Sequence, residues 1–207
     1  MIGIVDYYAG NLRSVESALR RIGADFFVSD RPEELLKAER LIFPGDGEAS
    51  SAMKFLRGRG LDGMLHEYVG RGSPVLGICL GCQIILSRSE EGDTPCLGIV
   101  DGTCRLLPRS PGLKVPHMGW NTMDFADRHP LLEGIASGSF FYFVHSYYPE
   151  PGAESRAIGW TEYGTRFSSG FGRGNLAAFQ FHPEKSGEAG LRLLSNFVEW
   201  DPMGETL

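Results

Sequence analysis

The chain has 207 residues, 42% hydrophobic and 22% charged, which is enough apolar sequence for one sizeable core. Its 20 Lys and Arg against 26 Asp and Glu give a net charge of −6, which argues against the basic face of a nucleic-acid binder. No apolar run reaches the about 18 residues that span a bilayer, and the first residues lack the basic stretch and cleavage site of a signal peptide. We therefore expect a cytoplasmic protein that binds neither nucleic acid nor membrane and keeps its four cysteines reduced.

The first half of the sequence alternates short apolar runs with segments of helical periodicity. Strands are expected at 2–6, 26–29, 40–44 and 75–78, and helices at 12–22, 48–58 and 61–71. Strand and helix in alternation predict an α/β domain with a parallel sheet and right-handed crossovers.

The second half is rich in β-forming residues and close turns. The β-rich segments are 97–125, 139–148, 155–169 and 175–182, which suggests hairpins that extend or flank the sheet, and a last helix is expected over 184–200. We expect one domain over residues 1–200 and a short tail over 201–207 that begins with a helix-stopping Asp-Pro pair.

Residues 74–86, PVLGICLGCQIIL, hold Cys79 and Cys82 in a C-x-x-C spacing that redox pairs and zinc sites use. The redox interpretation is weak, because such a motif usually has a polar or Pro-containing exposed loop, whereas here a Leu-Gly pair separates the cysteines. A zinc site that adds Cys96 and Cys104 is also weak, because these two are too far apart in sequence for a structural zinc knuckle. We therefore predict no metal site.

The glycines around Cys79 favour a nucleophile elbow, G-x-C-x-G over 77–81, at a sharp turn between a strand and a helix. A thiol there lies at a helix N-terminus, where free N–H groups favour the thiolate. The N–H of Leu80 would point toward an oxyanion on the attacked carbonyl. The alternative is a cysteine that only packs between strand and helix, which is also the role expected of Cys82.

A cysteine nucleophile needs a base and a group that orients the base. His182 closes the apolar run 176–181 and is followed by Pro183 and Glu184. If the extended backbone continues, His182 and Glu184 point to the same side, and Glu184 accepts from one ring nitrogen while the other faces the thiol. The other four histidines lack this context: a surface helix for His66, a turn without a polar partner for His129, and strand ends or loops with aromatic neighbours for His117 and His145.

Several motifs taken together resemble those of a known enzyme family. They are GICLGCQ (77–83), HPEKS (182–186), PGDG (44–47), PHMGWN (116–121), YFVHSYY (142–148) and the opening DYYAGNLRSVESAL (6–19). They occur in the same order as in class I glutamine amidotransferases, which they resemble. More narrowly, they resemble the glutaminase subunits of imidazole glycerol phosphate synthase. The resemblance implies a three-layer α/β/α fold with a mostly parallel central sheet and additional antiparallel strands in the second half.

The resemblance implies a catalytic triad of Cys79, His182 and Glu184 that hydrolyses L-glutamine through a γ-glutamyl thioester, with no cofactor. The family's oxyanion and substrate contacts fall here on Gly45, Gly47, Leu80, Gln83, His145, Ser146 and Tyr147. Gln83 lies one helical turn past Cys79, where its amide could reach a ligand or could instead face solvent.

The segment PGDG departs from the family pattern at Asp46, where relatives commonly carry Val. Its glycines permit a peptide flip that would supply a second oxyanion donor beside Leu80. A carboxylate near a thiolate and an oxyanion is unfavourable. We therefore expect the Asp46 side chain to face solvent or a partner, with only its backbone serving the site.

The resemblance also implies a partner that receives the ammonia, a cyclase subunit with a (β/α)8 barrel in a heterodimer. That cyclase makes imidazole glycerol phosphate and aminoimidazole carboxamide ribotide, and this sequence has no phosphate-binding G-x-x-x-x-G-K loop of its own. Family position puts the interface at Asn11, Met118, Trp120, Asn121 and Lys185. Trp120 could instead belong to the core, and Lys185 could be a solvated charge at a helix start.

Two other functions remain open from the sequence. A paralogous amidotransferase could supply ammonia for surface-sugar biosynthesis with a similar barrel partner. A non-hydrolytic protein of the same architecture could use the elbow cysteine as an oxidation sensor. The sensor does not need the His-Pro-Glu triplet, whose presence counts against it.

Overall fold

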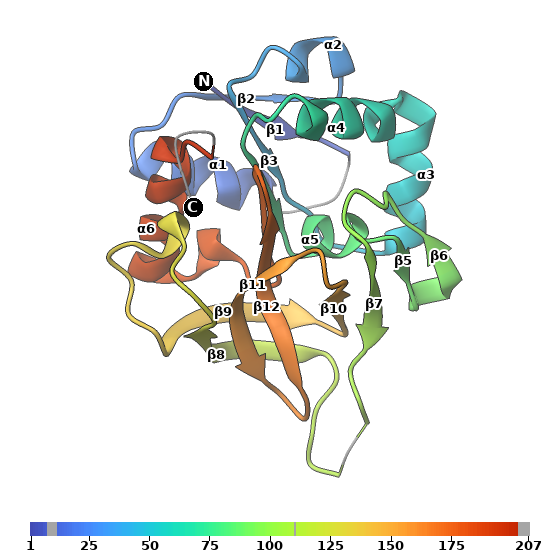
Figure 1. Ribbon diagram of the computed structural model, residues 1–207, viewed down its shortest axis with the longest axis vertical. Coiled ribbons are helices and arrows are strands. Elements are labelled where there is room, and N and C mark those ends of the chain that lie inside the picture. The colour runs from blue at the N-terminus through green and yellow to red at the C-terminus, as the bar shows by residue number, and fades with distance from the viewer. Residues whose placement is uncertain (8–11, 110, 203–207) are drawn as a thin grey trace.

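A nine-stranded mixed sheet runs through the centre of this computed structural model, which describes residues 1–7, 12–109 and 111–202 (Figure 1). The parallel half has, in spatial order, β2 (Phe26–Ser29), β1 (Ile2–Val5), β3 (Arg40–Phe43), β4 (Val75–Ile78) and β13 (Leu176–Phe179). The antiparallel half continues with β12 (Arg166–Arg173), β11 (Arg156–Glu162), β8 (His117–Phe125) and β9 (Ser139–His145).

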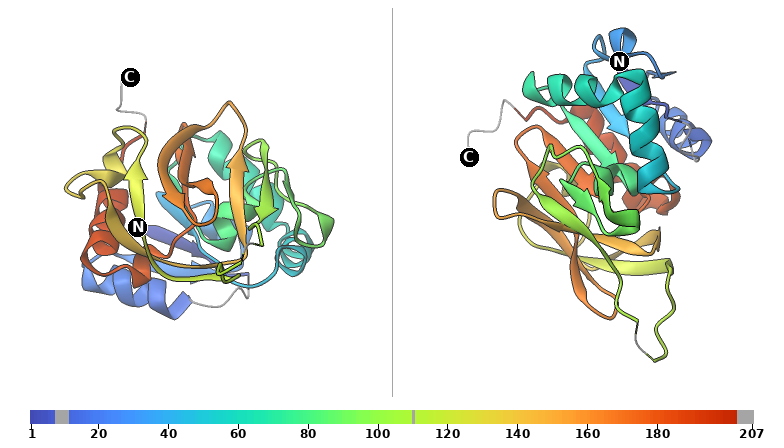
Figure 2. Two further views of the ribbon diagram at one scale, coloured as in Figure 1. Left: turned by 90° about the horizontal axis from the view of Figure 1, so that it is seen from below. Right: turned by 90° about the vertical axis from the view of Figure 1, so that its right-hand side faces the viewer.

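Helices cover both faces of the parallel half and make it the middle layer of three (Figures 1 and 2). One face is covered by α1 (Leu12–Arg21) and α6 (Gly187–Glu199), and the other by α2 (Pro32–Leu35), α3 (Ala49–Arg59), α4 (Leu61–Gly70) and α5 (Leu80–Ile84). Within the described residues, no helix is both long and apolar enough to cross a membrane.

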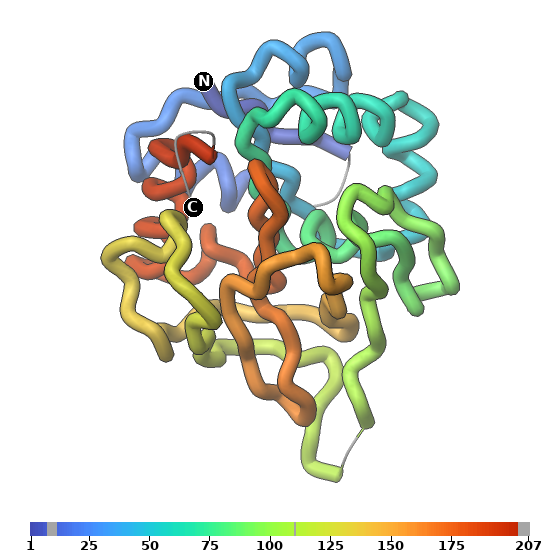
Figure 3. The backbone as a smooth tube through the Cα atoms, in the orientation of Figure 1, coloured from blue at the N-terminus to red at the C-terminus, as the bar shows by residue number. Residues whose placement is uncertain are grey.

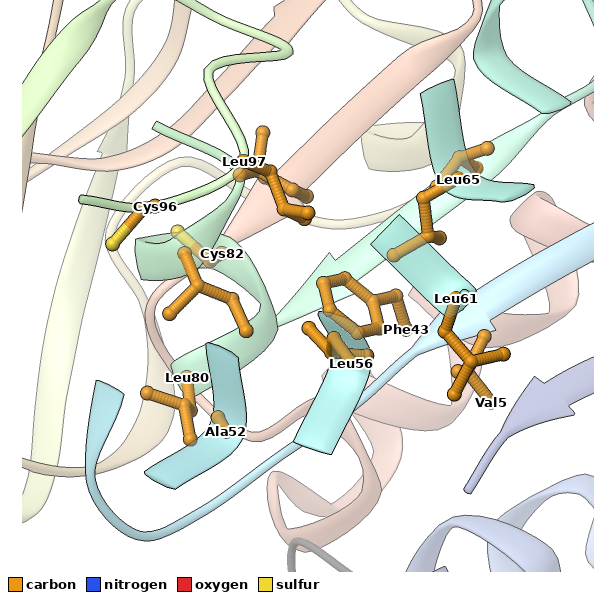
Figure 4. Packing of buried hydrophobic residues seen from close by; sticks show 14 of the residues in the cluster. Val5, Phe43, Ala52, Leu56, Leu61, Leu65, Leu80, Cys82, Cys96 and Leu97 are labelled. Atoms are coloured by element: carbon orange, nitrogen blue, oxygen red, sulfur yellow. The ribbon is translucent and has the colours of Figure 1, made fainter. Parts of the chain in front are cut away.

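Alternate side chains of the parallel strands feed two hydrophobic clusters, one on each face of the sheet. Ile42 of β3 packs toward α1 and α6, whereas Phe43, the next residue, packs toward α3 and α5. This alternation follows from the two-residue repeat of a strand whose two faces are both buried. Figure 4 shows Phe43 beside Leu56 of α3, in the cluster that also fixes the position of Leu80.

A second, four-stranded sheet flanks the first and borders the region after α5. Its order is β10 (Tyr147–Pro151), β7 (Gly102–Leu106), β5 (Arg88–Ser89) and β6 (Thr94–Pro95). Residues 107–109 and 111–116, between β7 and β8, extend away from the body of the molecule (Figure 3). Three short 3-10 helices complete the described elements, at Glu91–Asp93, Pro130–Leu132 and Pro183–Lys185.

The predicted α/β fold, with its parallel first half and antiparallel second half, is confirmed. The four-residue helix α2 was not predicted, because it is too short to show a periodic pattern. The last helix begins later than predicted. Residues 183–185 form a separate 3-10 turn, and α6 starts at Gly187, whose φ of +59° breaks the two apart.

Candidate active site

Cys79 lies in a strained turn between β4 and α5. Its φ of 52° and ψ of −108° are unfavourable for a residue with a side chain. The turn leaves no room beside it: a Cβ on Gly81 would lie 2.0 Å from the carbonyl oxygen of Phe43, and one on Gly77 would lie 2.7 Å from Cδ1 of Ile85. Gly81 is therefore required for packing, whereas a side chain at Gly77 would have to displace the end of Ile85.

His182 and Glu184 form a buried pair at the end of β13. The Nδ1 atom of His182 lies 2.8 Å from Oε1 of Glu184, and their side chains are 1% and 0% exposed. The expected extended backbone through His-Pro-Glu is wrong beyond His182, because Pro183 starts a 3-10 turn. That turn brings Glu184 back to the ring, so the contact forms with a different local geometry.

The thiol of Cys79 lies close to this pair. Burial alone would lower the pKa of His182, but the charge of Cys79, its hydrogen bond to the ring, and Glu184 together raise that pKa to about 10. The Sγ atom also lies 3.8 Å from the carbonyl oxygen of Val144, and Nε2 of Gln180 donates to it at 3.7 Å. The ring of His182 is thus placed to hold the proton that the thiol gives up.

A cavity of about 220 Å³ opens onto the thiol. Beside Cys79 and Leu80 it is lined by Asp46, Gly47, Gln83, Glu91, His145, Ser146 and Tyr147. The structure therefore brings together at one cavity most of the residues that the family resemblance assigns to glutamine.

Gln83 faces inward, and the alternative that it faces solvent is wrong, since it is only 6% exposed. Its Nε2 atom donates to the carbonyl oxygen of Tyr147 at 2.8 Å and to Oε1 of Gln180 at 3.0 Å. These contacts fix the Gln83 amide at the wall of the cavity.

The main-chain N–H of Leu80 is occupied in this structure. It donates to the carbonyl oxygen of Gly45 at 3.2 Å. Gly45 is itself confined, because a Cβ there would lie 1.8 Å from the hydroxyl of Tyr7. An oxyanion can bind to the Leu80 N–H only after the Gly45 carbonyl has moved.

Asp46 is one of the residues that line the cavity. It is half-buried, and its charge reaches the buried Tyr7. Burial, then the charges of Cys79 and Asp46, raise the pKa of the Tyr7 hydroxyl well above its usual value. The Tyr7 hydroxyl stays neutral and has no hydrogen-bond partner among the described residues.

Sequence reasoning missed Glu91 and Gln180. The Glu91 carboxylate accepts from the N–H of Ala49 at the start of α3 at 2.8 Å, and burial raises its pKa. Glu91 stands in a polar loop without periodicity, so no sequence pattern set it apart. Gln180 could have been found from the sequence. It is the only polar residue in the run 176–181 before His182, and a buried polar side chain needs a partner.

The remaining cysteines are buried thiols. Cys82, Cys96 and Cys104 are unpaired, and burial raises the pKa of each. No group of three His, Cys, Asp or Glu side chains within the described ranges is arranged to hold a metal ion. Cys82 packs in the cluster shown in Figure 4, away from the cavity lining.

One of the other histidines differs from expectation. His66 is exposed on the helix α4, as predicted, and its Nε2 atom lies 2.9 Å from the carbonyl oxygen of Leu97. His129 was expected to lack a polar partner, which is wrong: its Nδ1 atom accepts from the N–H of Leu131 at 3.2 Å. His117 and His145 contact each other, as described below.

Large apolar side chains are exposed where β8 pairs with β9. Met118 is 64% exposed, Trp120 56% and Phe140 60%, so the core alternative for Trp120 is wrong. Asn121 instead turns its amide inward, to the carbonyl oxygen of Glu162 at 3.0 Å. Lys185 is half-buried in the 3-10 turn after His182, and Asn11 lies outside the described residues.

A thiol at a strand-to-helix turn, beside a buried His–Glu pair on a three-layer α/β/α fold, is typical of hydrolases with a cysteine nucleophile. The family profile described as Glutamine amidotransferase class-I matches residues 3–200, and the chain belongs to this family.

Within the family, the chain is similar over nearly its full length to proteins named imidazole glycerol phosphate synthase subunit HisH. It is 48% identical to that of Maridesulfovibrio salexigens, covering 97% of both chains. It is also 48% identical to that of Methanosarcina acetivorans, covering 96% of this chain and 98% of the relative. Among solved structures, PurLQS from Thermotoga maritima matches with a TM-score of 0.72 at 19% identity, over 96% of this chain and 97% of the other, and shares the fold.

Proposed function

We propose that this chain is the glutaminase subunit of an imidazole glycerol phosphate synthase and hydrolyses L-glutamine to glutamate and ammonia. The observation that carries the proposal is the Cys79 thiol at a strained turn, with the His182–Glu184 pair hydrogen-bonded beside it. Near-full-length similarity to HisH subunits supports the same reaction. We further propose that residues 1–200 act as one domain and that the reaction takes place in the cytoplasm.

In the first half of the reaction, His182 takes the proton of Cys79, and the thiolate attacks the carboxamide carbon of glutamine. The tetrahedral intermediate then breaks its C–N bond. His182 returns the proton to the leaving nitrogen, which departs as ammonia and leaves a γ-glutamyl thioester on Cys79. Glu184 holds Nδ1 of the ring at 2.8 Å, so that Nε2 faces the reacting atoms.

In the second half, a water molecule attacks the thioester carbon while His182 takes a proton from it. The C–S bond breaks, Cys79 leaves as the thiolate beside the protonated ring, and glutamate is released. Return of that proton from His182 to Cys79 restores the starting state, so the same ring acts twice as base and twice as acid. The 1% exposure of His182 keeps bulk water away from it between these steps.

The cavity offers complementary groups for the amino-acid end of glutamine. The Glu91 carboxylate lines it and is suited to accept from the α-ammonium group. The Gln83 amide is held by Tyr147 and Gln180, so its position is set before the substrate arrives. We assign substrate binding to these residues together with Gly47, His145 and Ser146, which line the same cavity.

Full activity requires a change at Gly45. Its carbonyl oxygen occupies the Leu80 N–H that an oxyanion needs. A flip of the peptide between Gly45 and Asp46 would free the Leu80 N–H and turn the Asp46 N–H toward the site. We propose that binding of the partner favours this flipped arrangement, which would prevent hydrolysis from running without an acceptor for ammonia.

The apolar face of Met118, Trp120 and Phe140 is the proposed docking surface for the cyclase barrel. An exposed apolar patch of this kind marks an interaction site. The surface adjoins the cavity, because Met118 pairs in register with Val144, which lines the cavity. A barrel docked there would cover the mouth of the site and receive the ammonia. Lys185, beside the His182–Glu184 pair, is the charge we assign to the same interface.

The test is to mix the chain with a cyclase subunit and its phosphorylated substrate, and to follow glutamate release and imidazole glycerol phosphate formation. We expect glutamate release to depend on the cyclase and to match product formation. Glutamate release that is high in the free chain and unchanged by the cyclase would refute the coupled-subunit proposal.

A further inference from the structure

A line of hydrogen bonds connects the partner-facing strand β8 with the wall of the cavity. Nδ2 of Asn121 lies 3.3 Å from Nε2 of His117, Nδ1 of His117 lies 3.0 Å from Nε2 of His145, and Nδ1 of His145 lies 2.9 Å from the carbonyl oxygen of Tyr147. His117 and His145 are only 3% and 5% exposed. The two imidazole rings in the middle of the line are therefore shielded from water.

The two ends determine where every proton lies. A carbonyl oxygen only accepts, so Nδ1 of His145 carries the hydrogen and its Nε2 accepts. Nδ1 of His117 must then donate to His145, which leaves Nε2 of His117 to accept from the Asn121 amide. Both rings are thus in the Nδ1–H form, and neither has room for a second proton.

Further contacts support this assignment. Oδ1 of Asn121 accepts from the N–H of Thr122 at 2.8 Å, and its Nδ2 donates to the carbonyl oxygen of Glu162, so the amide cannot be reversed. Burial lowers the pKa of His117 to about 4 and that of His145 to about 3, which keeps both rings neutral.

The line continues to the nucleophile. The carbonyl oxygen of Tyr147 also accepts from Nε2 of Gln83 at 2.8 Å, and Nε2 of Gln83 contacts Oε1 of Gln180 at 3.0 Å. Nε2 of Gln180 in turn donates to Sγ of Cys79 at 3.7 Å. Tyr147 is thus the point where two donors from opposite sides meet on one oxygen.

Aromatic rings hold His117 in this orientation. It stacks on Phe143 with ring centroids 4.8 Å apart and on Tyr163 at 3.8 Å. A ring held between two others cannot turn to exchange its nitrogens. The register of β8 with β9, which pairs His117 with His145, brings the two imidazoles together.

We propose that His117, with Asn121 behind it, is a positioning residue for the glutamine site: through His145 and the Tyr147 carbonyl it holds the Gln83 amide at the cavity wall. This rests on the proposed function only in naming glutamine as the ligand. His117 itself does not line the cavity, so it acts through its neighbours. Because Gln83 contacts bound substrate before and during the reaction, loss of its position raises KM more than it lowers kcat.

The first test needs no partner and no substrate. Long-range ¹H–¹⁵N spectra of the histidine rings in the full chain are expected to show both His117 and His145 as the Nδ1–H tautomer, which is the less common form in water. An Nε2–H tautomer at either ring would overturn the proposal, because the line would then be broken.

The second test measures glutamine hydrolysis by the full chain with a cyclase subunit. His117→Phe keeps the ring stacking and removes the donor to His145, and we expect KM for glutamine to rise about tenfold with a smaller change in kcat. His117→Asn places an amide donor near the position of Nδ1 and is expected to restore most of the lost affinity.

The matched control is Phe167→Leu. The ring centroid of Phe167 lies 5.4 Å from that of His145 and 6.5 Å from that of His117, and Phe167 forms no hydrogen bond of the line. Phe167→Leu therefore loosens the same aromatic cluster without breaking the line. A KM for His117→Phe equal to that of Phe167→Leu, or no rescue by His117→Asn, would overturn the positioning role. Wild-type protein that does not hydrolyse glutamine at all would instead refute the proposed function and leave the tautomer result standing.

Discussion

The N–H of Leu80 donates to the carbonyl oxygen of Gly45 at 3.2 Å, so the group expected to bind an oxyanion is already engaged. This arrangement depends on the absence of a side chain at Gly45. The hydroxyl of Tyr7 occupies the space where a Cβ would stand, 1.8 Å away, and the Cβ of Leu80 lies 3.2 Å from it. The resting position of the segment is therefore set by packing from two sides.

Gly45→Ala is expected to destabilise the protein by about 1–3 kcal/mol, because overpacking forces Tyr7 or the main chain to move. We also expect at least a tenfold loss of partner-dependent glutamate release. Urea unfolding and a glutaminase assay would measure the two effects. The control is Gly58→Ala in α3, where a Cβ meets no atom within 4 Å. If Gly45→Ala were as stable and active as Gly58→Ala, the packing argument would be wrong.

The two cysteines of the C-x-x-C spacing are expected to behave differently. Cys79→Ser should lower the rate of glutamine hydrolysis by at least about a thousandfold, because a serine hydroxyl is a far weaker nucleophile than a cysteine thiolate at neutral pH. Cys82→Ser should keep most of the activity and lose some stability, because it puts a hydroxyl into an apolar cluster. Glutamate release and thermal unfolding of both variants measure this. Activity that survives Cys79→Ser and is abolished by Cys82→Ser would reverse the assignment.

Glu184→Gln tests the group behind His182. The amide of Gln can present an N–H to Nδ1, which favours the wrong ring tautomer, so we expect kcat to fall by about 10²- to 10⁴-fold. Gln has nearly the same volume as Glu, so the substitution leaves the packing around this fully buried side chain unchanged. Circular dichroism and partner binding should match the wild type, and kcat from glutamate release carries the test. A kcat within about twofold of wild type would mean that the carboxylate does not orient the base.

The parallel half of the fold could be predicted from the sequence because its strands are buried on both faces. Such strands are continuous apolar runs, and 26–29, 40–44 and 75–78 were recognised within a residue of β2, β3 and β4. The second half was predicted as β-rich hairpins and a last helix, without the pairing of the individual strands. Which strands pair, as in β8 with β9, depends on contacts far apart in the chain that no local pattern encodes.

The site residues likewise divide into those that a local motif reveals and those that only the three-dimensional structure reveals. Cys79 and His182 stand in local motifs, so the sequence could single them out. Glu91 reaches the cavity from the 3-10 helix Glu91–Asp93, and its contact with the cavity depends on the three-dimensional position of that turn next to α3. The state of the Leu80 N–H could not be predicted either, because a peptide flip changes a hydrogen bond without changing a residue.

The docking surface makes a prediction about affinity. Trp120→Ala and Phe140→Ala are each expected to raise Kd for the cyclase partner about tenfold or more, because large exposed aromatic residues dominate the energy of such interfaces. Neither should change thermal unfolding of the free chain much. Leu106→Ala is the control, since Leu106 is 41% exposed but lies on β7 of the second sheet. Titration calorimetry would measure all three, and equal Kd values would exclude this face as the interface.

Stability should depend on pH through His129. Burial, and then the charge of Arg156, lower its pKa in the folded protein to about 4, against about 6.5 in the unfolded chain. Between these values only the unfolded chain binds the proton. The free energy of unfolding therefore falls as the pH falls, by up to about 1.4 kcal/mol per pH unit from this group alone.

His129→Asn removes that titration and keeps an acceptor for the N–H of Leu131, because Asn is a favourable helix N-cap. Urea unfolding at pH 6.5 and pH 5 should show the wild type losing about 1.6 kcal/mol more than His129→Asn. All other titrating groups are common to both proteins and cancel in the difference. Parallel losses in the two proteins would mean that His129 takes up its proton in the folded state as readily as in the unfolded one.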